Sequence, residues 1–218
     1  MVMKLINTIE INPLKYSKEE YELPEISDYP DTEEWYRKWM EVVSKLNVGF
    51  HTLKKDSYLV DINTISEEDL QMILEVHLSD VEQDNIEDTV VSFDGRIVVM
   101  QDDEILIQPT CCGFISYIKD WERIFEHQSS GWLDIWIGHP WILCKKENGK
   151  VLFSDYTESN ISDNENIKVI FEAEESELKI EFEKVKQDQI SFKNRITETL
   201  KKMYVENAEK ISELITGI

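Results

Sequence analysis

The chain has 218 residues, of which 41% are hydrophobic and 31% are charged, a composition typical of a globular domain and not of a disordered chain. Its 45 acidic residues outweigh 23 Lys and Arg and give a formal net charge of −22. Such a charge repels phosphate backbones and anionic lipids, so we expect no nucleic acid and no membrane as a partner, while a basic protein is favoured. The alternative is an acidic surface that only keeps the chain soluble.

The cysteine content and the lack of long apolar runs predict a cytoplasmic protein. Cys111 and Cys112 are adjacent, and together with Cys144 they do not form a disulfide framework, which agrees with a reducing compartment. No apolar run reaches the roughly 20 residues that a membrane helix needs. The first residues also lack the unbroken apolar segment of a signal peptide. The sequence does not indicate an oligomeric state.

The N-terminal part is expected to form an irregular arm followed by a helix. Residues 1–30 are punctuated by prolines and are predicted to pack on a single α+β domain of residues 31–218. Asp31 and Glu34 have the spacing of a capping box and open the predicted helix. Its apolar stripe, expected in the core, consists of Trp35, Trp39, Val42, Val43 and Leu46.

A hairpin and a second helix are predicted next. Residues 50–53 and 58–62 flank a polar turn and are expected to pair as two strands. Ser66 begins a second capping box, which predicts a helix through residues 70–78. The segment 61–88 contains ten Asp or Glu and no Lys or Arg, so it is the most acidic part of the chain.

The middle of the chain alternates with the period of β-strands. Asp94-Gly95 and Asn148-Gly149 lie between β-rich runs and predict tight hairpins. A helix is expected over residues 116–127, with Trp121 on its inner face. The predicted strands cover residues 89–93, 96–100, 104–108, 132–137, 141–145 and 151–156.

The C-terminal part is predicted to add one more hairpin and a long helix. The hairpin comprises residues 168–172 and 178–183, and the helix runs from about 187 to 215. Strands therefore occur in antiparallel runs between helices, without βαβ alternation. This order predicts an α+β fold: a mostly antiparallel sheet of several hairpins with flanking helices and a long C-terminal helix.

Residues 108–156 concentrate the chemically capable side chains of the chain. They include all three cysteines, two of the four histidines and four of the six tryptophans. The cysteine and histidine spacings do not match a zinc site, in which ligands come in pairs two to four residues apart. No phosphate-binding glycine loop or nucleophile elbow is present either. We therefore expect no metal site and no cofactor.

A cysteine nucleophile is the catalytic alternative. Cys112 precedes Gly113 at an expected strand-to-helix turn, where a helix N-terminus would lower the pKa of the thiol. His139 would then act as the base, oriented by Asp134 or Asp155. In the structural alternative, Cys112 packs in a tight corner and Gly113 supplies a positive φ.

The tryptophans of this block predict a binding surface. Trp132, Asp134 and Trp136 share one face of a predicted strand, and a Trp-Asp-Trp face is not a plain core face. The opposite face, at positions 133, 135 and 137, is wholly apolar and is assigned to the core. His139 lies in the Gly-His-Pro bend that follows and is a further candidate binding residue.

The same residues carry a resemblance to known proteins. Cys111-Cys112-Gly113, Trp121 and the run from Trp136 to Trp141 resemble a marker shared by a group of bacterial proteins of uncharacterised function. More loosely, the chain is similar to the SUKH superfamily of toxin-immunity proteins, which are likewise acidic α+β domains. Those proteins usually carry an Asn-Gly-Gly-like element where this chain has Asn47-Val48-Gly49.

These observations together favour a non-enzymatic binding protein over a cysteine-dependent hydrolase or transferase. The resemblance implies an immunity-type protein that occludes a basic toxin. Acidic side chains of segment 61–88 are expected to pair with basic groups of the partner, while the Trp face anchors it. The acidic candidates are Glu67, Glu68, Asp69, Asp80, Glu82 and Asp84.

Overall fold

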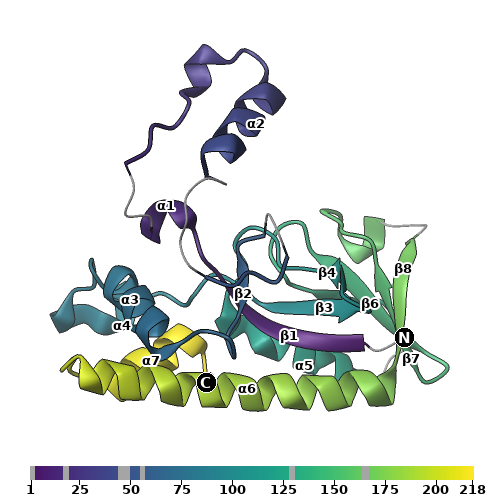
Figure 1. The fold of residues 1–218 in the computed structure, drawn as a ribbon. Helices are drawn as coiled ribbons and strands as arrows, with labels where there is room; N and C mark the ends of the chain where they lie inside the picture. Colours follow the sequence, from purple (N-terminus) through teal and green to yellow (C-terminus); the bar gives the residue numbers. More distant parts are fainter. Residues whose placement is uncertain (1–2, 17–19, 44–49, 55–56, 128–130, 164–166) are drawn as a thin grey trace.

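The computed structural model describes residues 3–16, 20–43, 50–54, 57–127, 131–163 and 167–218 (Figure 1). Two four-stranded antiparallel sheets and a set of helices make up the described chain, which confirms the predicted α+β class. Among the described residues no helix is both long and apolar enough to cross a membrane. The predicted stripe residue Leu46 and the segment 47–49 lie outside the described residues.

The first sheet has the strand order β2-β1-β3-β4 and contains the start of the chain at its centre. Strand β1 (Met3–Glu10) pairs antiparallel with both β2 (Leu59–Asp61) and β3 (Ile97–Gln101), and β3 pairs with β4 (Glu104–Ile107). The expectation of an irregular arm is therefore wrong for this stretch. Asn7 and Thr8 are fully buried polar residues, and they hide the alternation that marks a strand.

The second sheet has the strand order β5-β6-β7-β8. It consists of β5 (Leu133–Ile135), β6 (Ile142–Glu147), β7 (Lys150–Ser154) and β8 (Val169–Glu174). The predicted Asn-Gly hairpin is confirmed, because Asn148 and Gly149 have φ of 53° and 80° and join β6 to β7.

Three of the predicted strand segments, residues 50–53, 89–93 and 178–183, are not strands. Thr89 ends the short helix α4 (Ile86–Thr89) and residues 90–93 are irregular, with His77 bonded to Val91 O. Residues 50–53 pair with β2 only through one bond, from Leu53 N to Leu59 O, because β1 occupies the position expected for their strand. The predicted hairpin is therefore replaced by the long-range pair β1–β2.

Helix α6 (Glu175–Lys202) runs beneath both sheets and connects the two ends of the molecule (Figure 1). It includes residues 178–183, which were predicted as a strand. Leu178, Phe182 and Val185 are buried and follow the i, i+4, i+7 spacing of one helix face. Leu178, Ile180 and Phe182 also fit a period of two over a short window, which explains the wrong prediction.

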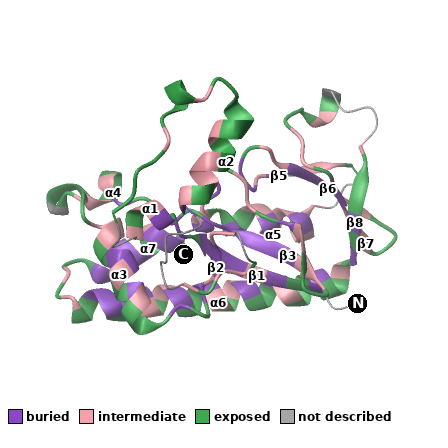
Figure 2. Ribbon diagram, turned by 45° about the horizontal axis from the view of Figure 1, so that its top comes forward, coloured by how far each residue is buried: buried purple, intermediate pink, exposed green. Residues whose placement is uncertain are grey.

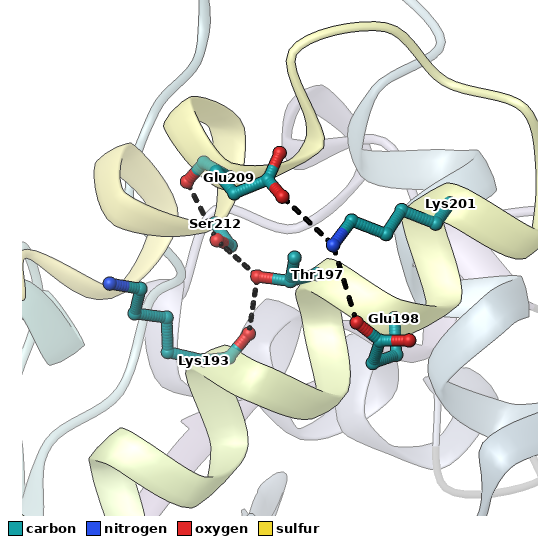
Figure 3. A network of polar contacts seen from close by, with 6 residues as sticks. All are labelled: Lys193, Thr197, Glu198, Lys201, Glu209 and Ser212. Atoms are coloured by element: carbon teal, nitrogen blue, oxygen red, sulfur yellow. Dashed lines mark hydrogen bonds and ion pairs between the residues drawn. The ribbon is translucent and has the colours of Figure 1, made fainter.

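The predicted single C-terminal helix is a pair of helices. After α6 the backbone adopts positive φ at Tyr204 and Asn207, and α7 (Ala208–Thr216) then packs against α6. Figure 3 shows the polar contacts between them, including the 2.7 Å bond between Thr197 Oγ1 and Ser212 Oγ. Lys201 Nζ also pairs with Glu209 Oε1 at 2.8 Å, so a hydrogen bond and an ion pair both hold α7 against α6.

The remaining helices differ in how deeply they pack. Helix α3 (Glu67–His77) begins as predicted, with Ser66 Oγ accepting from Asp69 N at 3.0 Å. Helix α2 (Thr32–Val43) also forms, but it stands away from the sheets (Figures 1 and 2) and buries only Val43. Trp35 and Trp39 are half-buried, so the expected core stripe is a partly exposed one. The short elements are α1 (Pro13–Tyr16), η1 (Ile26–Asp28), η2 (Gln83–Asn85), η3 (Ile115–Ile118) and η4 (Ile161–Asp163).

The core consists of two clusters of buried side chains. One lies between the second sheet, β1 and β3, α5 (Lys119–Glu126) and the first half of α6, with Trp121 and Phe153 among its largest members. The other joins α3, α7 and the second half of α6 around Phe192 and Ile196. Because α6 contributes to both clusters, it couples the two ends of the fold.

Candidate functional site

The predicted Trp-Asp-Trp face forms along β5 and its continuation. Ile135 and Ile137 are fully buried, as expected for the core face. On the opposite face Asp134 is exposed, and Trp132 and Trp136 are half-buried. The alternation predicted from the sequence therefore places these side chains correctly, and the Trp face is partly open to solvent.

A cluster of aromatic rings follows at the bend between β5 and β6. Trp136 and Trp141 are stacked with their ring centroids 5.7 Å apart, and the ring of His139 meets Trp141 edge-on at 5.6 Å. Beside them is a groove of about 490 Å³ whose lining includes Asp134 and residues 160–162. We call Asp134, Trp136, His139 and Trp141 the Trp corner. Two stacked indoles beside a carboxylate provide flat apolar surface and a negative charge, a combination that suits an arginine side chain.

The Cys-Cys-Gly segment supports this bend through the backbone. His139 N donates to Cys111 O at 2.9 Å, and Cys111 Sγ donates to His139 O at 3.1 Å. The positive φ of the corner, 61°, belongs to Cys112 and not to Gly113, so that part of the structural interpretation is wrong. The exposed Cys112 side chain does not pack in the corner either.

The residues of the predicted catalytic set are not brought into one contact network. The hydrogen bond and charge of neighbouring Cys111 raise the pKa of Cys112, opposite to the lowering expected for a nucleophile. Within the described residues, His139 approaches Glu158 (3.7 Å) and not Cys112. Asp134 pairs with Arg123 at 3.6 Å, and Asp155 pairs with Lys168 at 3.6 Å. These contacts do not activate the Cys112 thiol.

The acidic segment forms a separate unit, which we call the acidic lobe: α3, η2 and α4 with their connections, residues 67–88. Glu67 pairs with Lys202 at 2.8 Å, and this hydrogen bond and charge lower the pKa of Glu67. Asp69 is half-buried and accepts from Ser66 Oγ at 2.7 Å, so it serves the helix cap. These two carboxylates of the predicted set are thus already engaged within the chain.

Four other predicted carboxylates of the lobe are exposed: Glu68, Asp80, Glu82 and Asp84. Within the part of the chain that the structure describes, none of them forms an ion pair with Lys or Arg. Like charges gathered on one surface lower the stability of the fold, and an external cationic surface offsets that cost. The lobe is therefore suited to a basic partner.

The lobe and the Trp corner lie on different elements. The lobe packs near Lys202, at the C-terminal end of α6, whereas the Trp corner lies at the bend between β5 and β6. His139 of the Trp corner bonds to Cys111, and Phe114, three residues further along the chain, forms a bridge with Asp94. Among the described residues, no ion pair or ring contact directly joins the two sets of residues that were predicted to act together.

A further groove brings together residues that no sequence pattern connects. It has a volume of about 530 Å³ and lies between the end of β1, α1, α3 and the loop before β3. Glu10, Tyr16, His77 and Asp94 line it. Asp94 was interpreted only as part of a hairpin turn, because nothing in its local sequence shows that residues 10, 16 and 77 surround it.

Comparison of the chain with protein-family models, with curated proteins and with solved structures gives no match. Among the described residues, no group of three or more His, Cys, Asp or Glu side chains is arranged to hold a metal ion. The functional interpretation therefore depends on the geometry and charge of the chain itself.

Proposed function

We propose that this chain is a non-enzymatic binding protein that neutralises a basic protein, such as a bacterial toxin nuclease, by covering its surface. The observation that carries the proposal is the acidic lobe, where Glu68, Asp80, Glu82 and Asp84 are exposed and form no ion pair with the described Lys and Arg residues. The resemblance of the chain to acidic toxin-immunity proteins of the SUKH type points in the same direction.

The physics of association supports an acidic lobe of this kind. A cluster of one sign on a folded unit raises the local concentration of a partner of opposite sign and speeds encounter. Helix α3 is anchored by its buried Leu70, Ile73 and Leu74, so its exposed Glu68 is held on a rigid support. A side chain on a rigid support loses less conformational entropy when a partner binds.

The Trp corner is proposed as a second contact for the same partner. Its stacked Trp136 and Trp141 offer a face for an arginine, and Asp134 adds a charge that is only partly satisfied by Arg123 at 3.6 Å. Tryptophan and arginine are the residues that most often dominate interface energies. Trp132 and His139 would border this contact.

The decisive experiment uses charge reversal with a matched control. The lobe variant carries Glu68, Glu82 and Asp84 each replaced by Lys; the control carries the same number of reversals at exposed positions elsewhere, namely Glu22, Glu183 and Glu206. Each chain is co-expressed with each small basic protein found in the neighbourhood of its gene, and growth and the affinity of the purified pair are measured. We expect the wild type and the control to protect cells and the lobe variant to fail.

The ionic-strength dependence of binding and the charge-matched control give the results that would contradict the lobe interface. The association rate of the wild type should fall steeply as ionic strength rises, because exposed charges are screened within about 8 Å at physiological salt. Equal losses in the lobe variant and the control would mean that only net charge matters, and the proposed lobe interface would then be wrong. Protection that survives lobe reversal would also contradict it.

A further inference from the structure

The groove beside the acidic lobe is built from segments that are distant in sequence. Its walls come from the end of β1, from α1, from the end of α3 and from the segment leading to Asp94, and its volume is about 530 Å³. This volume is within the range of sites that hold a small molecule or a single large side chain. The backbone closes it from one side, where Glu10 N donates to Asp94 O at 2.8 Å.

The charges of the groove are unbalanced. Among the described residues that line it, Glu10, Asp80 and Asp94 contribute three carboxylates, against the one Lys or Arg side chain of Lys15. Partial desolvation and the nearby Asp94 raise the pKa of Glu10. Burial, with Asp94 again as the second cause, raises the pKa of Tyr16 to about 12. Both effects are those of a negative potential inside a partly enclosed space.

The remaining walls are apolar or neutral. Val76, Val91 and Phe93 line the groove, and the ring of His77 packs on Phe93 with centroids 4.5 Å apart. His77 Nε2 is 2.9 Å from Val91 O, which is an acceptor, so this nitrogen carries the proton. Burial lowers the pKa of His77, which keeps the ring neutral and adds no positive charge to the groove.

We propose that the groove receives one lysine or arginine side chain of the basic partner, with the aliphatic stem against Val76, Val91 and Phe93 and the cationic head between Glu10 and Asp94. This inference rests on the proposed function, because it assumes a basic protein partner. An anionic or neutral occupant is disfavoured, since three carboxylates face one lysine. A cation offsets the repulsion between Glu10 and Asp94 that an empty groove retains.

Small probes test the groove without the partner. N-acetyl-arginine methylamide is titrated while the imidazole resonances of His77 are followed by NMR, with N-acetyl-citrulline methylamide in equimolar salt as the neutral isostere. We expect saturable shifts with the arginine probe, with a Kd on the order of 1 mM, and no saturable shift with citrulline. Equal shifts with both probes, or none with arginine, would overturn the inference.

Two groove variants and one control variant test whether the arginine probe binds at these residues. Glu10→Gln with Asp94→Asn removes the two charges but keeps the shape, and we expect affinity for the arginine probe to fall by about tenfold or more. Lys15→Met removes the competing cation, so affinity should rise severalfold. Asp103→Asn with Glu104→Gln removes the same charge at the β3–β4 turn and should leave affinity unchanged. A loss as large in this control as in the groove variant would contradict the assignment.

The outcomes for the groove and for the proposed function are separable. When lobe reversal abolishes partner binding but the arginine probe does not bind, the binding function stands and the groove inference fails. When the probe binds but lobe reversal leaves partner affinity unchanged, the proposed lobe interface fails and the groove remains a cation site. When both stand, Glu10→Gln with Asp94→Asn should weaken partner binding while the Asp103 and Glu104 control does not.

Discussion

Asn7 and Gln189 are joined by a buried hydrogen bond between side chains, from Asn7 Nδ2 to Gln189 Oε1 at 2.8 Å. The amide nitrogen of Gln189 also donates to Ile115 O at 3.1 Å and to Thr216 O at 2.7 Å. One side chain of α6 thereby satisfies polar groups of β1, η3 and α7. Both residues are about 1% exposed or less, so no water replaces these bonds when they are lost.

Replacing Gln189 with Leu should lower the free energy of unfolding by about 3 kcal/mol, because it leaves three buried polar groups without a partner. Urea unfolding followed by circular dichroism measures the loss. Gln187→Leu on the exposed face of the same helix is the control and should change stability by about 0.5 kcal/mol or less. Equal effects of the two changes would show that the Gln189 network adds nothing to stability.

Replacing Gly138 with Ala should be far more damaging than the same change at Gly149. At Gly138 φ is 119°, and a Cβ would stand 2.4 Å from Cys111 O, so the backbone of the Trp corner would have to move. We expect a cost of about 3 kcal/mol or more. Gly149 has φ of 80° with nothing within 4 Å of an added Cβ, which predicts about 1 kcal/mol. The melting temperatures of the two variants test this difference, and similar values would contradict the close contact expected for a Cβ at Gly138.

The stability of the fold should depend on pH through His77. Its pKa is lowered from 6.5 by burial, so above pH 6.5 the ring is neutral in both the folded and the unfolded chain. As the pH falls below that value, the unfolded chain binds the proton first and the folded state loses stability. His77→Gln keeps a donor for Val91 O but does not titrate, so the stability of the wild type relative to this variant should decline below pH 6.5. A difference that stays constant from pH 7.5 to pH 5 would show that His77 is not the group involved.

The three thiols should differ sharply in reactivity. Burial raises the pKa of Cys144 to about 12, whereas Cys111 and Cys112 are exposed. Intact-mass analysis after N-ethylmaleimide treatment of the folded protein should therefore show labelling of Cys111 and Cys112 alone, with Cys144 labelled only in guanidinium chloride. A chain with Cys111→Ser and Cys112→Ser should take up no label while folded. Rapid labelling of that chain would mean that β6 opens readily.

The elements that the sequence predicted well are those whose signals are local. The Ser66 cap of α3, the Asn148-Gly149 turn and the alternation along β5 each depend on neighbours within a few residues, and the structure confirms them. In contrast, β1 was missed because buried Asn7 and Thr8 interrupt its apolar pattern. Those side chains are satisfied by Gln189 Oε1 and Arg96 O, partners that only the tertiary fold supplies.

Dependence on tertiary contacts also limits how much of the site could be predicted from the sequence. The exposure of Asp134 follows from alternation along one strand, and the acidic lobe follows from composition. The groove around Asp94 combines residues 10, 15, 77 and 94, which become neighbours only when β1 is placed at the centre of its sheet. The raised pKa of Cys112 depends on a hydrogen bond between its side chain and that of Cys111. That two residues are adjacent in the sequence does not show that their side chains meet.

The central position of β1 has a consequence for how the chain folds. The cover of β1 comes from a segment far along the chain, since α6 packs directly on β1 and Asn7 bonds to Gln189, 182 residues further on. Contacts between such distant segments form slowly, because the entropy of closing a long loop has to be overcome before the contact stabilises the fold. Until α6 docks, the apolar face of β1 lacks its cover, so the unfinished fold is the state most exposed to aggregation.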